Sequence, residues 1–205
     1  MPDFSYENKL WKKGINVIAG LDEVGRGSLA GPVVTAFVSF NKNTKMNILI
    51  NDSKKMSAKN RELANNWIKR NAINYGIGKA SVAEINRHGI VKATNMAFRR
   101  ALKNSHTKVD YLLIDAFYIP NIRGLRRTKQ LPIIKGDSKS YSIAAASIIA
   151  KVYRDELMTK LSQNKKYSSY CWHKNKGYGT KEHRDAIAKY GLTNYHRKLF
   201  TRKIV

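Results

Sequence analysis

The chain has 205 residues, and its 39 Lys and Arg against 14 Asp and Glu give a formal net charge of +25. The single cysteine, Cys171, excludes an internal disulfide, and no apolar run approaches the ~20 residues of a membrane-spanning helix. The N-terminal residues lack the charged and apolar regions of a signal peptide. These features predict one soluble cytoplasmic domain without a membrane partner, with a monomer as the default state.

The basic composition points to a polyanionic partner. The sequence pI is about 10.2, and proteins of such balance bind nucleic acid or, less often, an acidic membrane surface. The positive charge is spread along the chain without a long basic tail, which favours a folded basic face over a disordered arm. A basic metabolic enzyme is the alternative, but the chain has no Rossmann or P-loop glycine pattern.

The first half of the chain alternates apolar runs with one helical segment. Residues 15–21 and 31–40 read as buried strands, and the short connection between them predicts an antiparallel hairpin. A helix is expected over 57–71 and a third strand over 75–82. Ser57 is the expected N-cap of that helix.

The helix expected at 57–71 is amphipathic in the sequence. Leu63, Trp67 and Ile68 recur at helical spacing, so all three are predicted to face the core.

The second half alternates helices and strands. Helices are expected over 90–103, from Ser142 to about Gln163, and over 180–190, and strands over 109–115 and 131–135. This order predicts an α/β layer architecture with a mixed sheet. Residues 1–163 are expected to form the core, and the Lys-, Tyr- and His-rich segment 164–205 a helical cap of the same domain.

Four carboxylates stand at the ends of expected strands or at strand-to-helix junctions. Asp22 and Glu23 follow the first apolar run, Asp115 ends the run at 109–115, and Asp137 precedes the long helix. Such a cluster needs a cation to offset its repulsion, and Mg²⁺ or Mn²⁺ prefers oxygen ligands. Two ions ~4 Å apart would suit phosphodiester hydrolysis.

The adjacency of Asp22 and Glu23 raises a geometric problem, because neighbours on a regular strand point to opposite faces. Both can join one site only if the strand ends or bends there, which Gly25 and Gly27 would permit.

The other acidic residues receive structural roles. Asp155 is expected to pair with Lys151 one helical turn earlier, Asp52 to sit in a turn or cap, and Glu84 to begin or cap a helix. Surface or capping charges are expected at Asp3, Glu7, Glu62, Asp110, Glu182 and Asp185.

Six segments carry a family resemblance. They are 20–27 (Gly-Leu-Asp-Glu-Val-Gly-Arg-Gly), 30–34, 52–57, 113–115, 135–155 and 177–183. In this order they resemble bacterial ribonuclease HII, the type 2 ribonuclease H family, over nearly the whole chain. A departure is Ser28, where the family often has proline.

The resemblance implies a ribonuclease H-like fold, a five-stranded mixed sheet flanked by helices with a C-terminal helical extension. It implies a metal-dependent endonuclease that cuts the RNA strand of RNA–DNA hybrids and cuts 5′ to single ribonucleotides in duplex DNA. The metal-binding and catalytic residues would be Asp22, Glu23, Asp115 and Asp137, with Mg²⁺ or Mn²⁺ in a two-metal site.

The resemblance also implies substrate contacts. Gly25, Arg26 and Gly27 would contact the ribose 2′-OH and nearby phosphates, and Tyr178 would pack on the sugar at the RNA–DNA junction. Only the 2′-OH distinguishes RNA from DNA at one sugar, and Arg26 offers bidentate phosphate recognition. The alternatives are a solvated turn arginine and, for Tyr178, a loop aromatic or core anchor.

Several alternatives remain open from the sequence. One is ribonuclease HIII, which normally carries an N-terminal substrate-binding domain and a lysine at the position of Arg26. Another is a non-catalytic nucleic-acid-binding protein. His173 and His183 are expected to be cap or surface residues. Leu199 and Phe200 near the C-terminus are candidates for a motif that binds the replication sliding clamp.

Overall fold

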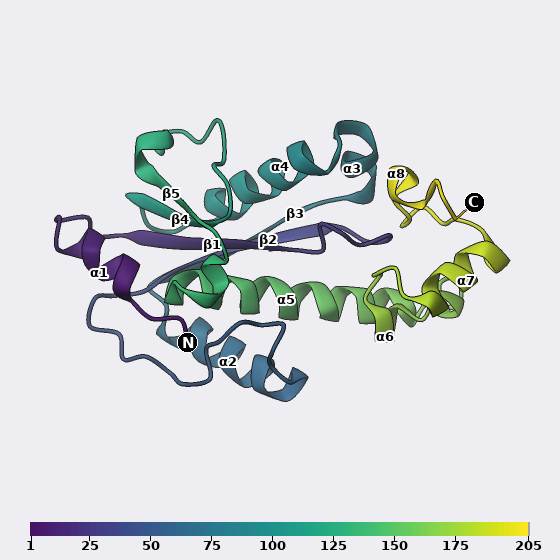
Figure 1. The fold of residues 1–205 in the computed structure, drawn as a ribbon, viewed down its shortest axis with the longest axis horizontal. Helices are drawn as coiled ribbons and strands as arrows, with labels where there is room; N and C mark the ends of the chain where they lie inside the picture. Colours follow the sequence, from purple (N-terminus) through teal and green to yellow (C-terminus); the bar gives the residue numbers. More distant parts are fainter. Residues whose placement is uncertain (205) are drawn as a thin grey trace.

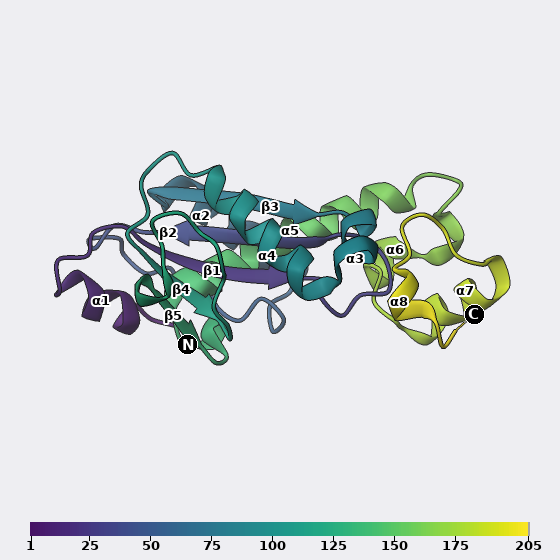
Figure 2. The ribbon, with the colours of Figure 1, turned by 90° about the horizontal axis from the view of Figure 1, so that it is seen from above.

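The structure is a computed structural model that describes residues 1–204. A five-stranded sheet lies between two helical layers (Figures 1 and 2). The strands are β1 (Ile18–Val24), β2 (Val33–Ser39), β3 (Asn74–Ala80), β4 (Tyr111–Asp115) and β5 (Gln130–Ile133). The α-helices are α1 (Ser5–Trp11), α2 (Ala58–Asn71), α3 (Val82–His88), α4 (Ile90–Lys103), α5 (Tyr141–Ser162), α6 (Trp172–Asn175), α7 (Lys181–Tyr190) and α8 (Lys198–Thr201).

The sheet is mixed, as the alternation of elements predicts. Its strand order is β3-β2-β1-β4-β5, with β1 antiparallel to β2 and parallel to β4. The hairpin prediction is therefore confirmed, although an eight-residue loop, 25–32, rather than a short turn joins the strands. Since β4 and β5 are also parallel, β1, β4 and β5 all end at the same edge of the sheet.

Helices α4 and α5 cover opposite faces of the sheet (Figure 1). Gly20 of β1 lies against the start of α5, where an added Cβ would overlap the backbone of Ser142. Gly78 of β3 meets the backbone of Ala97 on α4 in the same way. The two glycines allow both helices to approach the sheet closely, because they have no side chain at the contact.

Helix α5 is longer than the sheet that it covers. Its 22 residues span roughly 33 Å, whereas a seven-residue strand spans roughly 23 Å. The second half of α5 therefore extends beyond the strands and carries the segment from 164 onward at the far end of the molecule (Figure 1). That segment packs with the end of α5 in a separate apolar cluster, which includes Met158 of α5, Tyr167 and Trp172.

Most predicted elements are confirmed within a few residues, with two corrections. The first strand runs over 18–24 and not 15–21, because its pairing with β2 continues through Glu23 opposite Thr35 and Val24 opposite Val34. On α2, Ser57 is the N-cap as predicted and Ile68 is buried, but Leu63 is 48% exposed. The prediction for Leu63 is wrong because the buried stripe of α2 is narrow and runs through Ala64, not Leu63.

Candidate active site

Asp22 and Glu23 lie inside β1, not after it. Asp22 pairs with Ala36 and Glu23 with Thr35 in the regular register of β1 with β2. Asp22 is buried, and its Oδ1 accepts the backbone N–H of Glu23 at 2.7 Å. The strand is expected from the sequence to end or bend at these residues; it stays regular through both of them and ends one residue later, at Val24. The chain leaves the strand only at Gly25, whose φ is +89°.

Asp115 and Asp137 are joined by a backbone contact. Asp115 is the last residue of β4, next to β1 in the sheet. Its Oδ1 accepts the N–H of Gly136 at 2.8 Å, which draws the 3-10 turn Gly136–Ser138 to the strand end. Asp137 in that turn is buried, and its Oδ2 lies 3.2 Å from Nζ of Lys54. The turn therefore places Asp137 beside the acidic residues of the central strands.

The carboxylates are close enough to oppose one another's ionisation. Burial, followed by the charges of Glu23 and Asp115, raises the pKa of Asp22 well above its ordinary value. Burial also raises the pKa of Glu23 to about 7, although Arg26 opposes this shift. The pKa of Asp115 is raised by burial and by Asp137, against the Gly136 hydrogen bond. The structure thus brings the four predicted residues into one electrostatically coupled group.

Two cations reach this group from the protein. Arg26 Nη1 lies 3.2 Å from Glu23 Oε1, and its guanidinium also sits 5.1 Å from the ring centroid of Phe117. Lys54 pairs with Asp137. Burial lowers the pKa of Lys54, but the combined attraction of Asp137, Asp22 and Asp52 makes the net shift upward. Four carboxylates against two side-chain cations leave the group short of positive charge.

The donor set fits a hard divalent cation. Glu23 Oε2 is buried and has no hydrogen-bond partner among residues 1–204. Carboxylate oxygens with raised pKa values gain from a cation nearby. Among residues 1–204, however, no three His, Cys, Asp or Glu side chains already converge as ligands of one ion. Two of the carboxylates form ion pairs with side chains instead: Glu23 with Arg26, and Asp137 with Lys54.

The glycine-rich loop 25–32 and the segment 177–183, which contains Tyr178, lie side by side. The N–H groups of Leu29 and Ala30 both donate to the carbonyl of Gly177, at 2.9 and 3.2 Å. Tyr178 is half-buried, and its ring centroid is 5.6 Å from Lys151 Nζ. The two segments predicted to contact substrate are thus adjacent in space, although about 150 residues separate them.

A chain of buried rings supports the Tyr178 segment. The carbonyl of Tyr178 accepts from Nδ1 of His183 at 2.9 Å, so in the neutral ring Nε2 of His183 accepts. Trp172 Nε1 donates to that nitrogen at 3.0 Å, and His196 Nε2 lies 3.2 Å from it. His196 Nδ1 accepts the N–H of Thr193 at 2.9 Å. His183 is fully buried, so of its expected roles as a cap or surface residue the surface role is wrong.

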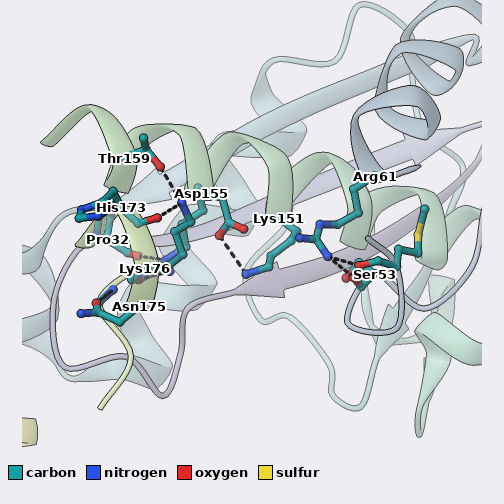
Figure 3. A network of polar contacts seen from close by, with 12 residues as sticks. Pro32, Ser53, Arg61, Lys151, Asp155, Thr159, His173, Asn175 and Lys176 are labelled. Carbon is teal, nitrogen blue, oxygen red and sulfur yellow. Dashed lines mark hydrogen bonds and ion pairs between the residues drawn. The ribbon is translucent and has the colours of Figure 1, made fainter. Parts of the chain in front are cut away.

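Three minor predictions are confirmed. Lys151 pairs with Asp155 at 2.9 Å along α5, as Figure 3 shows. Asp52 accepts the N–H of Lys54 in a turn. Glu84 forms a capping box with Ser81 at the start of α3.

Glu7 is expected from the sequence to be a surface or capping charge, and the structure shows the capping role and not the surface one. It is fully buried, and its Oε1 accepts from Ser140 Oγ at 2.7 Å and from the Ser142 N–H at 3.0 Å. Glu7 therefore caps α5 from another helix. Tertiary packing of α1 against the start of α5 supplies this contact, and no local pattern in the sequence signals it.

The C-terminal segment is fastened to α5 and to the sheet. Lys176 Nζ reaches Thr159 Oγ1 at 2.6 Å and the carbonyl of His173 at 2.7 Å (Figure 3). Phe200 packs on the cluster around Val33, whereas Leu199 is exposed. Of the two residues considered for clamp binding, Leu199 is therefore exposed and Phe200 is half-buried. No helix in residues 1–204 is long and apolar enough to cross a membrane.

A mixed five-stranded sheet of this strand order flanked by helices is the architecture of the ribonuclease H-like class. The family model described as Ribonuclease HII matches residues 19–203. A protein named ribonuclease HII from Wolbachia sp. subsp. Brugia malayi (strain TRS) is 52% identical over 202 residues, covering 97% of this chain and 93% of that protein. The chain therefore belongs to the ribonuclease HII family and is an endonuclease of the ribonuclease H type.

Solved structures agree on the fold. The ribonuclease H2 of Pyrococcus horikoshii OT3 superposes with a TM-score of 0.72 at 25% identity, covering 92% of this chain and 96% of that one. Bst-RNase HIII in complex with Mn²⁺ gives a TM-score of 0.73 at 22% identity, covering 92% of this chain and 69% of that one. The expected ribonuclease H-like fold is confirmed.

Proposed function

We propose that the protein is a divalent-metal-dependent endoribonuclease that cuts the RNA strand of RNA–DNA hybrids and cuts 5′ to single ribonucleotides in duplex DNA. The observation that carries the proposal is the coupled group of Asp22, Glu23, Asp115 and Asp137. Asp22 and Glu23 of this group lie in the strand that leads into the glycine-rich loop 25–32. Its partners would be hybrids and ribonucleotide-containing duplexes, and its role would lie in ribonucleotide excision and RNA primer removal.

The four carboxylates would hold Mg²⁺ or Mn²⁺. Mn²⁺ is the ion found with Bst-RNase HIII. When bound, two such ions supply an activated water and stabilise the oxygen that leaves phosphorus. The products would carry 5′-phosphate and 3′-hydroxyl ends.

Residues of the chain itself would bind and orient the substrate. Arg26 has a 39% exposed side chain beside Glu23, where its fork can engage a phosphate once the ion pair opens. Gly27 is exposed and leaves its backbone open to close approach. Tyr178 presents an aromatic face that can pack on a sugar. In this proposal, residues 1–163 form the catalytic core and 164–205 supply Tyr178.

The test uses a labelled DNA duplex with one embedded ribonucleotide, incubated with Mg²⁺ or Mn²⁺. An all-DNA duplex, a long RNA–DNA hybrid and the Asp137→Asn variant serve as controls. Cleavage 5′ to the ribonucleotide, lost in Asp137→Asn and without metal, is the expected result. Cleavage of the hybrid alone would instead indicate a ribonuclease HIII-like activity. Binding without any cleavage would overturn the proposal.

A further inference from the structure

Two fully buried arginines lie beneath the loop that joins β1 and β2. Arg154 of α5 and Arg197, just before α8, are both 0% exposed. None of the ion pairs formed within residues 1–204 includes either residue. A buried charge without a carboxylate partner is costly unless its hydrogen bonds are satisfied. Both guanidiniums bind backbone carbonyls instead.

Arg197 holds the two ends of the loop together. Its Nη2 donates to the carbonyl of Gly25 at 2.7 Å and its Nη1 to that of Arg26 at 2.8 Å. Nε and Nη2 both donate to the carbonyl of Gly31, at 3.0 and 2.9 Å. One planar guanidinium thus sets the separation between the start and the end of the loop. Burial, and then Arg154, lower its pKa to about 9, which leaves it charged at neutral pH.

Arg154 connects the same loop to the Tyr178 segment. It donates to the carbonyls of Ala30 and Pro32 at 3.1 and 3.0 Å, and to that of Lys176 at 2.9 Å. Its Cζ lies 5.3 Å from the ring centroid of Tyr178. A Cβ added at Gly25 would overlap its guanidinium. Both segments of the proposed substrate surface therefore rest on this side chain.

The direction of the loop amides follows from these contacts. In a trans peptide the C=O and the N–H point to opposite sides, and none of the peptide bonds described is cis. The carbonyls of Gly25 and Arg26 point inward to Arg197. The N–H groups of Arg26 and Gly27 consequently point away from it, and within residues 1–204 neither donates to a protein acceptor.

We propose that Arg197 and Arg154 are positioning residues, which hold the loop carbonyls from inside so that the N–H groups of Arg26 and Gly27 face a phosphate or 2′-OH oxygen of the substrate. This inference rests on the proposed function of the loop. The competing explanation is that the two arginines only stabilise the fold. The two explanations differ in the kinetic parameter that a conservative substitution changes.

The decisive variant is Arg197→Lys, which keeps the charge but replaces the fork by a compact ammonium that cannot reach the three carbonyls at once. Loss of ground-state substrate contacts raises KM with little change in kcat. We expect KM for a long RNA–DNA hybrid to rise about tenfold or more, with the half-activating Mg²⁺ concentration unchanged. A purely structural role would lower kcat through loss of folded enzyme and leave KM unchanged, and that result would overturn the inference.

The matched control is Tyr170→Phe. It removes two hydrogen bonds inside the C-terminal segment, to the carbonyls of Tyr190 and Gly191, and neither of these bonds involves the loop or the arginines. We expect it to lower Tm without raising KM. An equal rise in KM in this control would show that loss of stability alone explains the effect of Arg197→Lys.

A milder variant covers the case in which Arg197→Lys does not fold. The ring of Phe200 lies 5.3 Å from Arg197 Cζ, and Phe200→Leu removes this cation–π contact while keeping an apolar side chain. We expect KM to rise about two- to threefold, and an unchanged KM would count against the inference. The hybrid substrate separates this test from the proposed function: failure to cut the single-ribonucleotide duplex would contradict that activity, whereas the KM for the hybrid still tests the arginines.

Discussion

Lys54 Nζ lies 3.2 Å from Oδ2 of Asp137, although the two residues are 83 positions apart in the sequence. The lysine side chain is 75% exposed and the carboxylate only 8%. Lys54 therefore places a positive charge at the open side of the carboxylate group, where a divalent cation would also be attracted.

Replacing Lys54 by glutamine should tighten metal binding, because the lysine both competes for Asp137 and repels a second cation. In activity measurements against Mg²⁺ concentration, Lys54→Gln should lower the half-activating concentration about two- to fivefold, a modest effect because the lysine is solvent-exposed. Lys55→Gln, an exposed neighbour that forms no ion pair within residues 1–204, is the control. A higher half-activating concentration in Lys54→Gln would contradict the competition.

Neutralising Asp22 should stabilise the metal-free protein while abolishing cleavage. Burial and neighbouring acids raise the pKa of Asp22 in the folded state, whereas its pKa in the unfolded chain is about 4. The folded state is therefore favoured most below about pH 4, and it loses stability as the pH rises because the unfolded chain ionises Asp22 more easily. At pH 7, Asp22→Asn should raise Tm by about 2–4 °C, the shift that about 1 kcal/mol produces in a domain of this size.

Thermal melts with and without Mg²⁺ check this expectation for Asp22. Mg²⁺ should raise the Tm of the unaltered protein more than that of Asp22→Asn, since the variant has lost a ligand oxygen charge. Asp185→Asn changes an exposed acid on α7 and should alter neither quantity. If metal-free Asp22→Asn had a lower Tm than the metal-free unaltered protein, other groups of the protein would already stabilise the ionised carboxylate.

The two glycines that flank Arg26 should respond differently to alanine. Gly25 has a φ of +89° and no space for a Cβ beside Arg154, so Gly25→Ala should destabilise the fold. A Cβ added at Gly27 would meet no atom within 4 Å, so Gly27→Ala should leave Tm within about 1 °C. If substrate approaches the backbone there, kcat/KM should nevertheless fall about tenfold. Full activity in Gly27→Ala would exclude that approach.

The buried histidine pair should make the protein sensitive to acid. Burial, and then His183, lower the pKa of His196 to about 4, and burial lowers the pKa of His183. Because the pKa of each histidine is lower in the folded protein than in the unfolded chain, both rings are neutral in the native state. Their contribution to stability is therefore complete above pH 6.5 and is lost as pH falls from 6.5 towards 4.

Melts between about pH 7.5 and 4.5 test the histidine prediction. His196→Asn keeps an acceptor for the Thr193 N–H but removes one titrating ring, so its Tm should be lower at neutral pH and should fall less steeply as the solution is acidified. Parallel Tm curves for the variant and the unaltered protein would assign the acid sensitivity to other groups.

Local features were predictable from the sequence because their partners lie within a few residues. The Ser57 cap, the role of Glu84 at a helix start and the Lys151–Asp155 pair all depend on contacts one helical turn apart. The four carboxylates could be singled out because acidic residues next to apolar runs are unexpected in so basic a chain. Their substrate and metal roles remain predictions for the experiments above.

The sequence by itself determined the type and order of the main elements and the small set of acids on which a site could be built. Only the tertiary structure decided which polar groups are buried and which groups they bind. Glu7 accepts a hydrogen bond at the start of α5, and Arg154 and Arg197 donate hydrogen bonds to carbonyls of the loop 25–32. The physical reason is distance along the chain. The hydrogen bond from Arg197 to Gly25 joins residues 172 positions apart. Local sequence periodicity cannot predict such a contact, because it forms only when the C-terminal segment packs against the end of the sheet.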